Sequence, residues 1–256
     1  MSDPGLADAL FNPRAVALVG ASGDARKNTA RPQRFLTKHG FKGRILPINP
    51  GRDDVLGEKS YPHIASAPGP VDHAMIMTPG TAVPEVIADC IRAGVKVATI
   101  YSDGFAEAGA DGFRRQAEIV AMARDGGLRL IGPNSMGVID THSGSIITVN
   151  AALEAPDLIA GDIGVASHSG TILGTLISRG AARGIGFSKL VSLGNECDLG
   201  AGEVADLLVD DPDTRSILLF LESIRDPDSL ANAARRAHAA GKPVIVYKLG
   251  RSDAGR

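Results

Sequence analysis

Residues 163–171 carry the side chains of this sequence that are best suited to phosphoryl or proton transfer. An apolar run predicts a short buried strand that leads into Ser167-His168-Ser169-Gly170, and an apolar helical segment follows at 172–182. The first turn of a helix has unpaired N–H groups and the positive end of the helix dipole, so it favours a phosphate or another oxyanion. Histidine can accept a phosphoryl group or transfer a proton near neutral pH. The segment therefore predicts an anion-binding turn, in which His168 is either the phosphorylated nucleophile or a hydrogen-bond donor beside the phosphate.

A second anion-binding turn is predicted at Gly20-Ala21-Ser22-Gly23, directly after the apolar residues 15–19. The first strand-to-helix turn of a Rossmann fold holds a pyrophosphate at this place, although the glycines could also serve only close packing of helix and strand. The next predicted strand ends at Asn49, with no carboxylate for ribose hydroxyls, which disfavours NAD. A nucleotide with a phosphorylated ribose remains possible, because three cations are nearby in the sequence: Lys42, Arg44 and Arg52.

Strands and helices alternate along the whole chain, which predicts βαβ units and parallel sheets with right-handed crossovers. The expected strands are 15–19, 44–48, 71–77, 95–101, 128–131, 163–166, 190–193, 217–221 and 244–247. One helix is expected to pass through residues 35–36 and to end near residue 40. The other expected helices cover 84–94, 112–124, 171–183, 202–209 and 228–240. The alternation of apolar strands and helices weakens at residues 140–161. We therefore expect a domain at 1–140, a linker at 141–161 and a second α/β domain at 162–256.

Composition limits the classes of function. The chain has 256 residues, of which 44% are hydrophobic and 22% charged, with a net charge of −2. Without a basic excess we expect neither nucleic acid nor an anionic membrane as a partner. Cys90 and Cys197 are the two cysteines, too few for a disulfide framework and too far apart for a metal site. The N-terminus has no signal-peptide pattern and no apolar run is long enough to span a bilayer, so a cytoplasmic protein without a metal is predicted.

Polar turns follow most of the predicted strands. They are Thr78-Pro79-Gly80, Ser102-Asp103-Gly104-Phe105, Pro133-Asn134-Ser135 and Ser167–Gly170. Ligands of open α/β sheets bind outside the carboxyl ends of the strands, so these turns are expected to surround a ligand. Such turns are often polar and rich in glycine for structural reasons, and none of these short segments is specific alone.

Together, these segments and their neighbours resemble the NDP-forming acyl-CoA synthetases, a family related to the α subunit of succinyl-CoA synthetase. The segments are 16–23, 48–61 (INPGRDDVLGEKSY), 101–112 (YSDGFAEAGADG), 130–137 (LIGPNSMG), 167–174 (SHSGTILG), 184–198 (GIGFSKLVSLGNECD) and 210–224 (DDPDTRSILLFLESI). They occur in the family's order over nearly the whole chain. The resemblance implies a Rossmann-like CoA-binding domain followed by a flavodoxin-like domain with an open parallel sheet. It also implies formation of acyl-CoA, NDP and phosphate from a carboxylic acid, CoA and NTP, through an acyl phosphate and a phosphohistidine.

The resemblance also assigns roles to individual residues. The CoA site would comprise Gly20, Ala21, Ser22, Gly23, Arg44 (or Lys42), Pro79, Asp103, Gly104 and Phe105. Asn134 would lie near the CoA thiol, while Ser135 departs from the family, which usually has cysteine there. Ser169 and Gly170 would hold the phosphate of a phosphohistidine, and Glu222 would orient its imidazole. His168 then becomes a neighbour of that phosphate, since relatives generally have Gln or Arg at its position.

The family's phosphorylated histidine lies about a dozen positions beyond a segment that resembles residues 248–252, in a Ser-His-Thr-Gly turn. We therefore expect this chain to be a fragment that is inactive alone. An ATP-grasp domain or subunit would supply ATP, ADP and Mg²⁺, and an oligomer is expected. The identity of the acid stays open. Two alternatives are a CoA-sensing or scaffolding module, such as the inactive synthetase-like half of an acyltransferase fusion, and a Rossmann dehydrogenase, which Asn49 and the lack of a catalytic Tyr/Lys or His/Asp pair disfavour.

Overall fold

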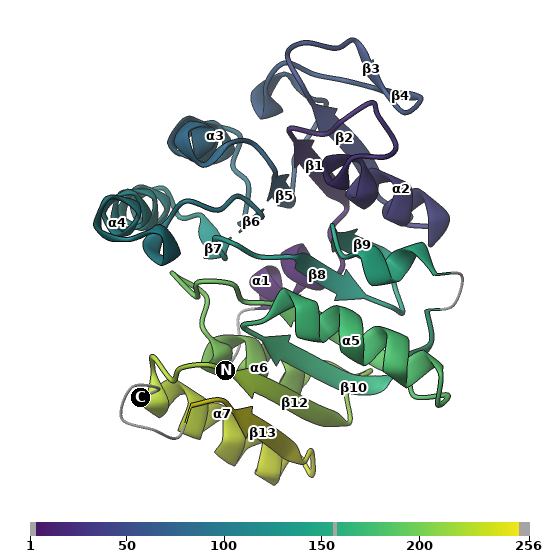
Figure 1. Cartoon of the computed structure of the whole chain (residues 1–256), viewed down its shortest axis with the longest axis vertical. Coiled ribbons are helices and arrows are strands. Elements are labelled where there is room, and N and C mark those ends of the chain that lie inside the picture. Colours follow the sequence, from purple (N-terminus) through teal and green to yellow (C-terminus); the bar gives the residue numbers. More distant parts are fainter. Residues whose placement is uncertain (1–3, 156–157, 251–256) are drawn as a thin grey trace.

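The computed structural model describes residues 4–155 and 158–250, which form two α/β units placed one above the other in Figure 1. The first unit contains a parallel sheet in the order β2-β1-β5-β6-β7. Its strands are β1 (Ala15–Val19), β2 (Arg44–Ile48), β5 (His73–Ile76), β6 (Val97–Ile100) and β7 (Arg129–Ile131). A short hairpin of β3 (Asp54–Val55) and β4 (Glu58–Lys59) follows β2.

Helices cover both faces of the first sheet. They are α2 (Arg31–Lys38), α3 (Val83–Arg92) and α4 (Ala110–Asp125). Ala15, Ala17 and Val19 of β1 belong to the same core as buried residues of α3 and α4. The alternate residues Val16 and Leu18 pack in a core with Leu36 of α2. β1 is therefore buried on both faces, which explains why its sequence is continuously apolar rather than alternating.

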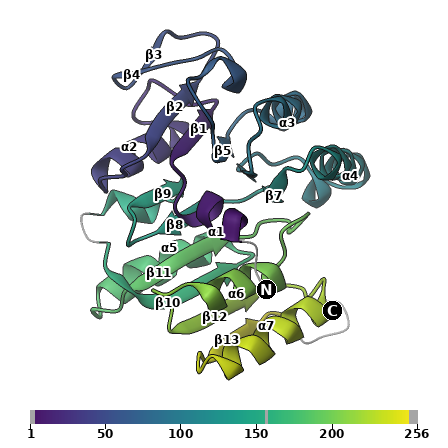
Figure 2. The ribbon, with the colours of Figure 1, turned by 180° about the vertical axis from the view of Figure 1, so that it is seen from behind.

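The second unit is a six-stranded sheet in the order β13-β12-β10-β11-β8-β9. Four strands are parallel: β10 (Ala160–Ser167), β11 (Phe187–Ser192), β12 (Ser216–Leu221) and β13 (Val244–Lys248). The antiparallel pair β8 (Gly137–Asp140) and β9 (Ser145–Thr148) extends the sheet beyond β11. Figures 1 and 2 show α5 (Gly170–Ala181) on one face of this sheet and α6 (Ala201–Asp210) with α7 (Pro227–Ala239) on the other.

The predicted fold class is confirmed, with a difference at the junction between the units. Residues 141–161, expected to be a linker, contain β9 and a 3-10 helix at Ala151–Glu154. β8, placed by prediction in the first domain, pairs with β11 of the second sheet, so that sheet is mixed rather than purely parallel. The apolar runs of β8 and β9 flank a turn with Gly144 at φ 73°, which is a hairpin pattern.

Helix α1 (Pro4–Phe11) joins the two units and was not expected from the sequence. Its Leu6, Leu10 and Phe11 are buried in a core with residues of both sheets and of α6. This apolar contact fixes the relative position of the units, and hence of the turns at their junction. No helix in the described part of the chain has the length and apolar character needed to cross a membrane.

Candidate functional site

The predicted CoA turn, Gly20–Gly23, lies at the carboxyl end of β1. Gly20 has φ +83°, and a Cβ there would lie 3.1 Å from the backbone of Met77, so this glycine serves the close approach of β5. The N–H groups of Gly20, Ala21 and Ser22 donate to backbone carbonyls. A 3-10 helix at Asn28–Ala30 precedes α2, which begins only at Arg31, so the helix N-terminus expected at the turn is displaced along the chain.

Arg52, rather than Arg44, is the cation at this turn. A Cβ on Gly23 would lie 2.9 Å from Nη1 of Arg52, so the guanidinium covers the turn. Arg44 is the first residue of β2 and pairs with Ala15 at the amino end of the parallel strands. Its guanidinium donates to the carbonyls of Pro68 and Pro70 at that opposite edge. The placement corrects the expectation for Arg44, because parallel strands begin and end at opposite edges of a sheet.

Two further predicted CoA turns contact each other. A Cβ on Gly80, next to Pro79, would overlap the Asp103 carbonyl oxygen. The N–H groups of Gly104 and Phe105 donate to Oε1 of Glu107, at 2.6 and 3.0 Å. The Phe105 ring is buried, so the turn offers a ligand the exposed Asp103 side chain rather than an aromatic surface.

The Pro133-Asn134-Ser135 turn links the two units. Asn134 is exposed and has φ +58°, and its side chain has no hydrogen bond to any residue that the structure describes. Ser135 is fully buried, and its hydroxyl donates to the Ser192 carbonyl at 2.6 Å. The residue that departs from the family therefore connects the β7 turn to β11, while Asn134 remains accessible to a ligand.

The Ser169-Gly170 turn forms the N-terminus of α5, as predicted. Ser169 is the N-cap, and its Oγ accepts a hydrogen bond from the Ile172 N–H at 3.4 Å. A Cβ on Gly170 would overlap Met136, which requires glycine where the β7 turn approaches the helix. The Asn134 N–H also donates to the Ser102 carbonyl at 3.0 Å, so the structure brings the 103–105, 133–135 and 169–170 turns together at one junction.

Both ring nitrogens of His168 make hydrogen bonds within the protein. Its side chain is 5% exposed, and Nε2 lies 2.8 Å from Oε2 of Glu196. Nδ1 accepts a hydrogen bond from the Glu222 N–H at 2.9 Å. This arrangement assigns the neutral tautomer with the proton on Nε2. Both nitrogens are engaged by protein groups, so the geometry favours the neighbouring role over the phosphorylated nucleophile.

Glu196 is a site residue that the sequence did not reveal. Its carboxylate is 5% exposed, and Oε1 accepts a hydrogen bond from the Ala201 N–H, at the start of α6, at 2.6 Å. Its position in the loop after β11, at the same sheet edge as His168, was the available signal. Glu222, by contrast, has an exposed side chain, with no hydrogen bond or ion pair to the described residues.

Two family models match the chain, one for each unit. Residues 14–141 match a CoA binding domain, and residues 160–256 match a succinyl-CoA ligase like flavodoxin domain. The chain is 37% identical over 255 residues to an ADP-forming acetate–CoA ligase II of Archaeoglobus fulgidus, covering 99% of this chain and 37% of that protein. It is 34% identical to the α subunit of an ADP-forming acetate–CoA ligase I of Pyrococcus furiosus, covering 97% of this chain and 54% of the subunit.

The chain belongs to the NDP-forming acyl-CoA synthetase family. A solved structure, the apo form of a dinucleotide-forming acetyl-coenzyme A synthetase 1 of Candidatus Korarchaeum cryptofilum, superposes with a TM-score of 0.89 at 36% identity. The match covers 97% of this chain and 53% of that one. The resemblance found in the motifs is therefore confirmed, and the chain spans about half, or less, of the length of these relatives.

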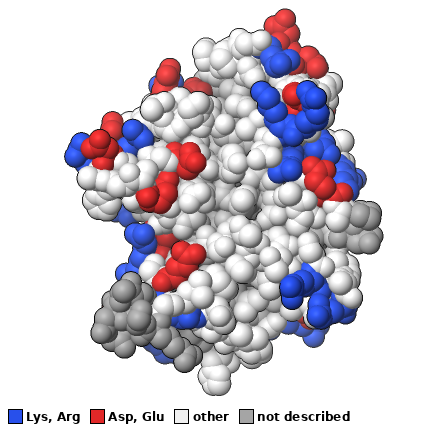
Figure 3. All heavy atoms as spheres, in the orientation of Figure 1, with Lys and Arg blue, Asp and Glu red and all other residues white. Residues whose placement is uncertain are grey.

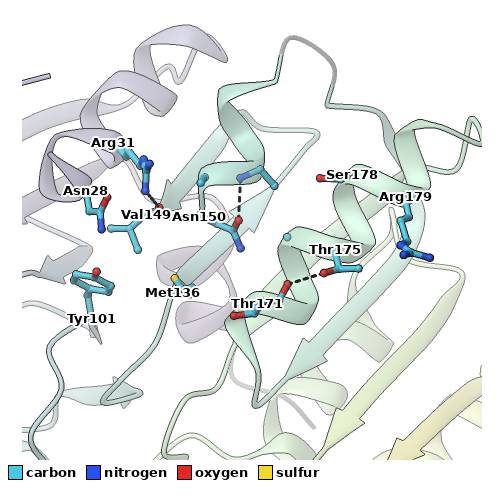
Figure 4. A pocket seen from close by; sticks show the side chains of 13 residues that line it. Asn28, Arg31, Tyr101, Met136, Val149, Asn150, Thr171, Thr175, Ser178 and Arg179 are labelled. Atoms are coloured by element: carbon cyan, nitrogen blue, oxygen red, sulfur yellow. Dashed lines mark hydrogen bonds between the residues drawn. The ribbon is translucent and has the colours of Figure 1, made fainter. Parts of the chain in front are cut away.

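In this synthetase-family chain, a cleft of about 670 Å³ opens between the units beside the Ser169-Gly170 turn (Figure 4). One wall is the face of α5 that presents Thr171, Gly174, Thr175, Ser178 and Arg179. The opposite wall is formed by Asn28, Arg31, Tyr101, Met136 and residues 149–152. The cleft is thus lined by small, hydroxyl, amide and apolar groups, with one arginine in each wall.

Charge is distributed unevenly around this face. Figure 3 shows basic side chains gathered over α2 and the β3–β4 hairpin, and again near the end of α5, whereas the centre is mostly uncharged. Arg31, at the edge of the cleft, forms an ion pair with Glu154, which also pairs with Arg34, and donates to the Val149 carbonyl. Among the described residues, no group of His, Cys, Asp and Glu could hold a metal ion. Burial raises the pKa of the Cys197 thiol to about 12, so this cysteine is not a reactive thiolate.

Proposed function

We propose that this chain supplies the CoA-binding and phosphate-holding parts of an NDP-forming acid–CoA ligase. The observation that carries the proposal is the meeting of the two sets of turns: the CoA-domain turns at 103–105 and 133–135 and the Ser169-Gly170 turn border one junction. A thiol delivered along the first set would therefore reach a phosphate or acyl phosphate held by the second. The ligase names of the relatives support this proposal over a CoA-sensing module.

In the proposed reaction, a phosphohistidine transfers its phosphoryl group to a carboxylate oxygen of the acid, giving an acyl phosphate. The CoA thiolate then attacks the carbonyl carbon, and phosphate leaves as the thioester forms. The N-terminus of α5, with the Ser169 cap, would stabilise the phosphate through its N–H groups and dipole. Glu222 would orient the phosphorylated imidazole, and Asn134 would lie beside the thiol.

The cleft beside Thr171 is the proposed place for the carbon chain of the acid, because it adjoins the phosphate turn and its walls carry small and apolar groups beside Arg31 and Arg179. The phosphoryl donor and Mg²⁺ would act through an ATP-grasp domain or subunit. The relative named as an α subunit supports a partner of this kind.

The CoA site can be tested by calorimetry and thermal denaturation of this chain. We expect CoA, but not NAD, to raise the melting temperature, since a ligand at a hundredfold its Kd stabilises a protein by about 2.7 kcal/mol. Arg52→Ala should weaken CoA binding about tenfold through loss of a charge-assisted contact with a CoA phosphate. Arg44→Ala is the matched control and should bind CoA like the unaltered chain. Stabilisation by NAD alone would overturn the proposal, while equal loss in both variants would overturn the role of Arg52.

A further inference from the structure

The loop of residues 194–200, here named the junction loop, joins β11 to α6 and reaches from the second unit to β7 (Figure 1). Its N–H groups at Asn195, Cys197 and Leu199 donate to carbonyls of residues 133, 132 and 130, at 2.8, 3.0 and 3.0 Å. A Cβ on Gly194 would overlap the Pro133 carbonyl oxygen. The junction loop is therefore fixed by backbone hydrogen bonds along the end of β7 and the turn that follows it.

The junction loop is connected to the proposed CoA turn through Glu107. Oε1 of Glu107 accepts the N–H groups of Gly104 and Phe105, and Oε2 accepts the side-chain amide of Asn195. Burial acts to raise the pKa of Glu107, but the Asn195 amide and the backbone N–H groups outweigh it and lower the pKa, which keeps the carboxylate ionised. The same Asn195 amide donates to Oε1 of Gln116 at 3.0 Å.

The next residue of the junction loop continues to the phosphate turn. Glu196 has φ 52°, a left-handed conformation that a non-glycine residue keeps only where its surroundings enforce it. Its carboxylate is fixed between the Ala201 N–H and the Nε2–H of His168. Arg225 is the neighbouring cation, with Nε 3.7 Å from Oε2. On its other side, His168 holds the backbone N–H of Glu222.

We propose that Glu107, Asn195, Glu196 and His168 are positioning residues that couple occupancy of the 103–105 turn to the position of Glu222. The coupling rests on the proposed function, because it assigns CoA to that turn. Glu196 and His168 have few alternative partners because both are buried, whereas Glu107 is exposed and is held by its hydrogen bonds to Gly104, Phe105 and Asn195. Through these bonds we expect a displacement of the Gly104 and Phe105 N–H groups by a ligand to move Glu107, Asn195 and the 195–196 peptide. By linkage, the state of the phosphate turn changes CoA affinity by the same factor.

The coupling can be tested by NMR on the chain labelled with ¹⁵N-histidine. CoA saturation is followed in parallel by calorimetry, and the His168 ring signals are assigned by their loss in His168→Gln. In the unaltered chain we expect the His168 ring signals to shift in proportion to CoA saturation. Asn195→Ala should still bind CoA but lose this shift, because the amide that joins Glu107 to the junction loop is gone. Asn232→Ala, on the exposed side of α7, is the matched control and should retain the shift.

Glu107→Ala provides a second test in case Asn195→Ala does not fold. Its methyl group can accept neither the Gly104 and Phe105 N–H groups nor the Asn195 amide, so the link between the turn and the junction loop is removed at its other end. This variant should also bind CoA without a His168 shift. Binding of CoA to the unaltered chain with no His168 shift, or a full shift in either variant, would overturn the coupling alone. Absence of CoA binding by the unaltered chain would overturn the proposed function and the coupling with it.

Discussion

His73 gives the stability of this fold a predictable dependence on pH. The side chain is fully buried at the start of β5, and Nε2 lies 2.8 Å from Oγ1 of Thr99. Nδ1 has no well-aligned partner among the described residues, although the Ala9 and Leu10 carbonyls of α1 are near it. Burial lowers the pKa of His73 from 6.5 to about 4, a shift that these carbonyls and Asp72 only partly oppose. The histidine is therefore neutral in the native state at neutral pH.

The sign and size of the effect follow from this pKa. Because the unfolded chain binds the proton more tightly than the folded chain, the contribution to stability is fully present above pH 6.5 and is lost as the pH falls toward 4. One pKa unit corresponds to about 1.4 kcal/mol. The two pKa values give a loss of about 2 kcal/mol between about pH 7.5 and about pH 5, and of about 3.4 kcal/mol once the pH lies below both. The loss would loosen α1 from the first sheet.

The measurement is urea denaturation of the unaltered chain and of His73→Gln at the two pH values. Glutamine can still bond to Thr99 but does not titrate, so the variant should lose about 2 kcal/mol less on acidification, whatever its absolute stability. The pKa of His39 is also lowered, first by burial and then by Lys38, so His39 adds a loss that both proteins share. The pKa of Asp72 is lowered as well, with the Arg14 interactions outweighing its burial, so its contribution disappears only at lower pH. Equal pH dependence of the two proteins would refute the reasoning.

The sheets could be predicted because their central strands, such as β1, β5, β6 and β11, are buried on both faces and are therefore mainly apolar. The predicted bounds of β1 and β2, 15–19 and 44–48, are those observed, since continuous apolar runs end at glycine, asparagine and proline. The turns of the candidate site follow from the same pattern, because parallel strands bring their carboxyl ends to one edge. The predicted bounds of β2 already imply that Arg44 is not at the ligand site, because the first residue of a parallel strand lies at the sheet edge opposite to the ligand.

The parts that were missed depend on contacts between distant segments. Helix α1 (Pro4–Phe11) is too short for a periodic pattern, and its apolar residues are identified only by the core that they share with both units. The role of Glu196 depends on a positive φ and on burial of its carboxylate against a residue 28 positions away, neither of which has a local sequence signal. Tertiary structure, rather than propensity, therefore decides the geometry of the phosphate turn.

Two further substitutions test buried polar groups of the second unit. Lys189→Met should destabilise the chain by about 3–5 kcal/mol, because Lys189 is 3% exposed and its removal leaves three neighbouring aspartates without their cation. The measurement is chemical denaturation, with the exposed Lys96→Met as the control. A similar small effect of both substitutions would contradict this prediction. His168→Gln should change neither CoA affinity nor melting temperature, because one glutamine amide can donate to Glu196 and accept from the Glu222 N–H. His168→Leu, which can do neither, should lower the melting temperature, since it removes the hydrogen bond to Oε2 of the buried Glu196 and leaves the Glu222 N–H group without its acceptor. Loss of stability in the glutamine variant equal to that in the leucine variant would show that the imidazole ring itself, rather than its two hydrogen bonds, holds the turn.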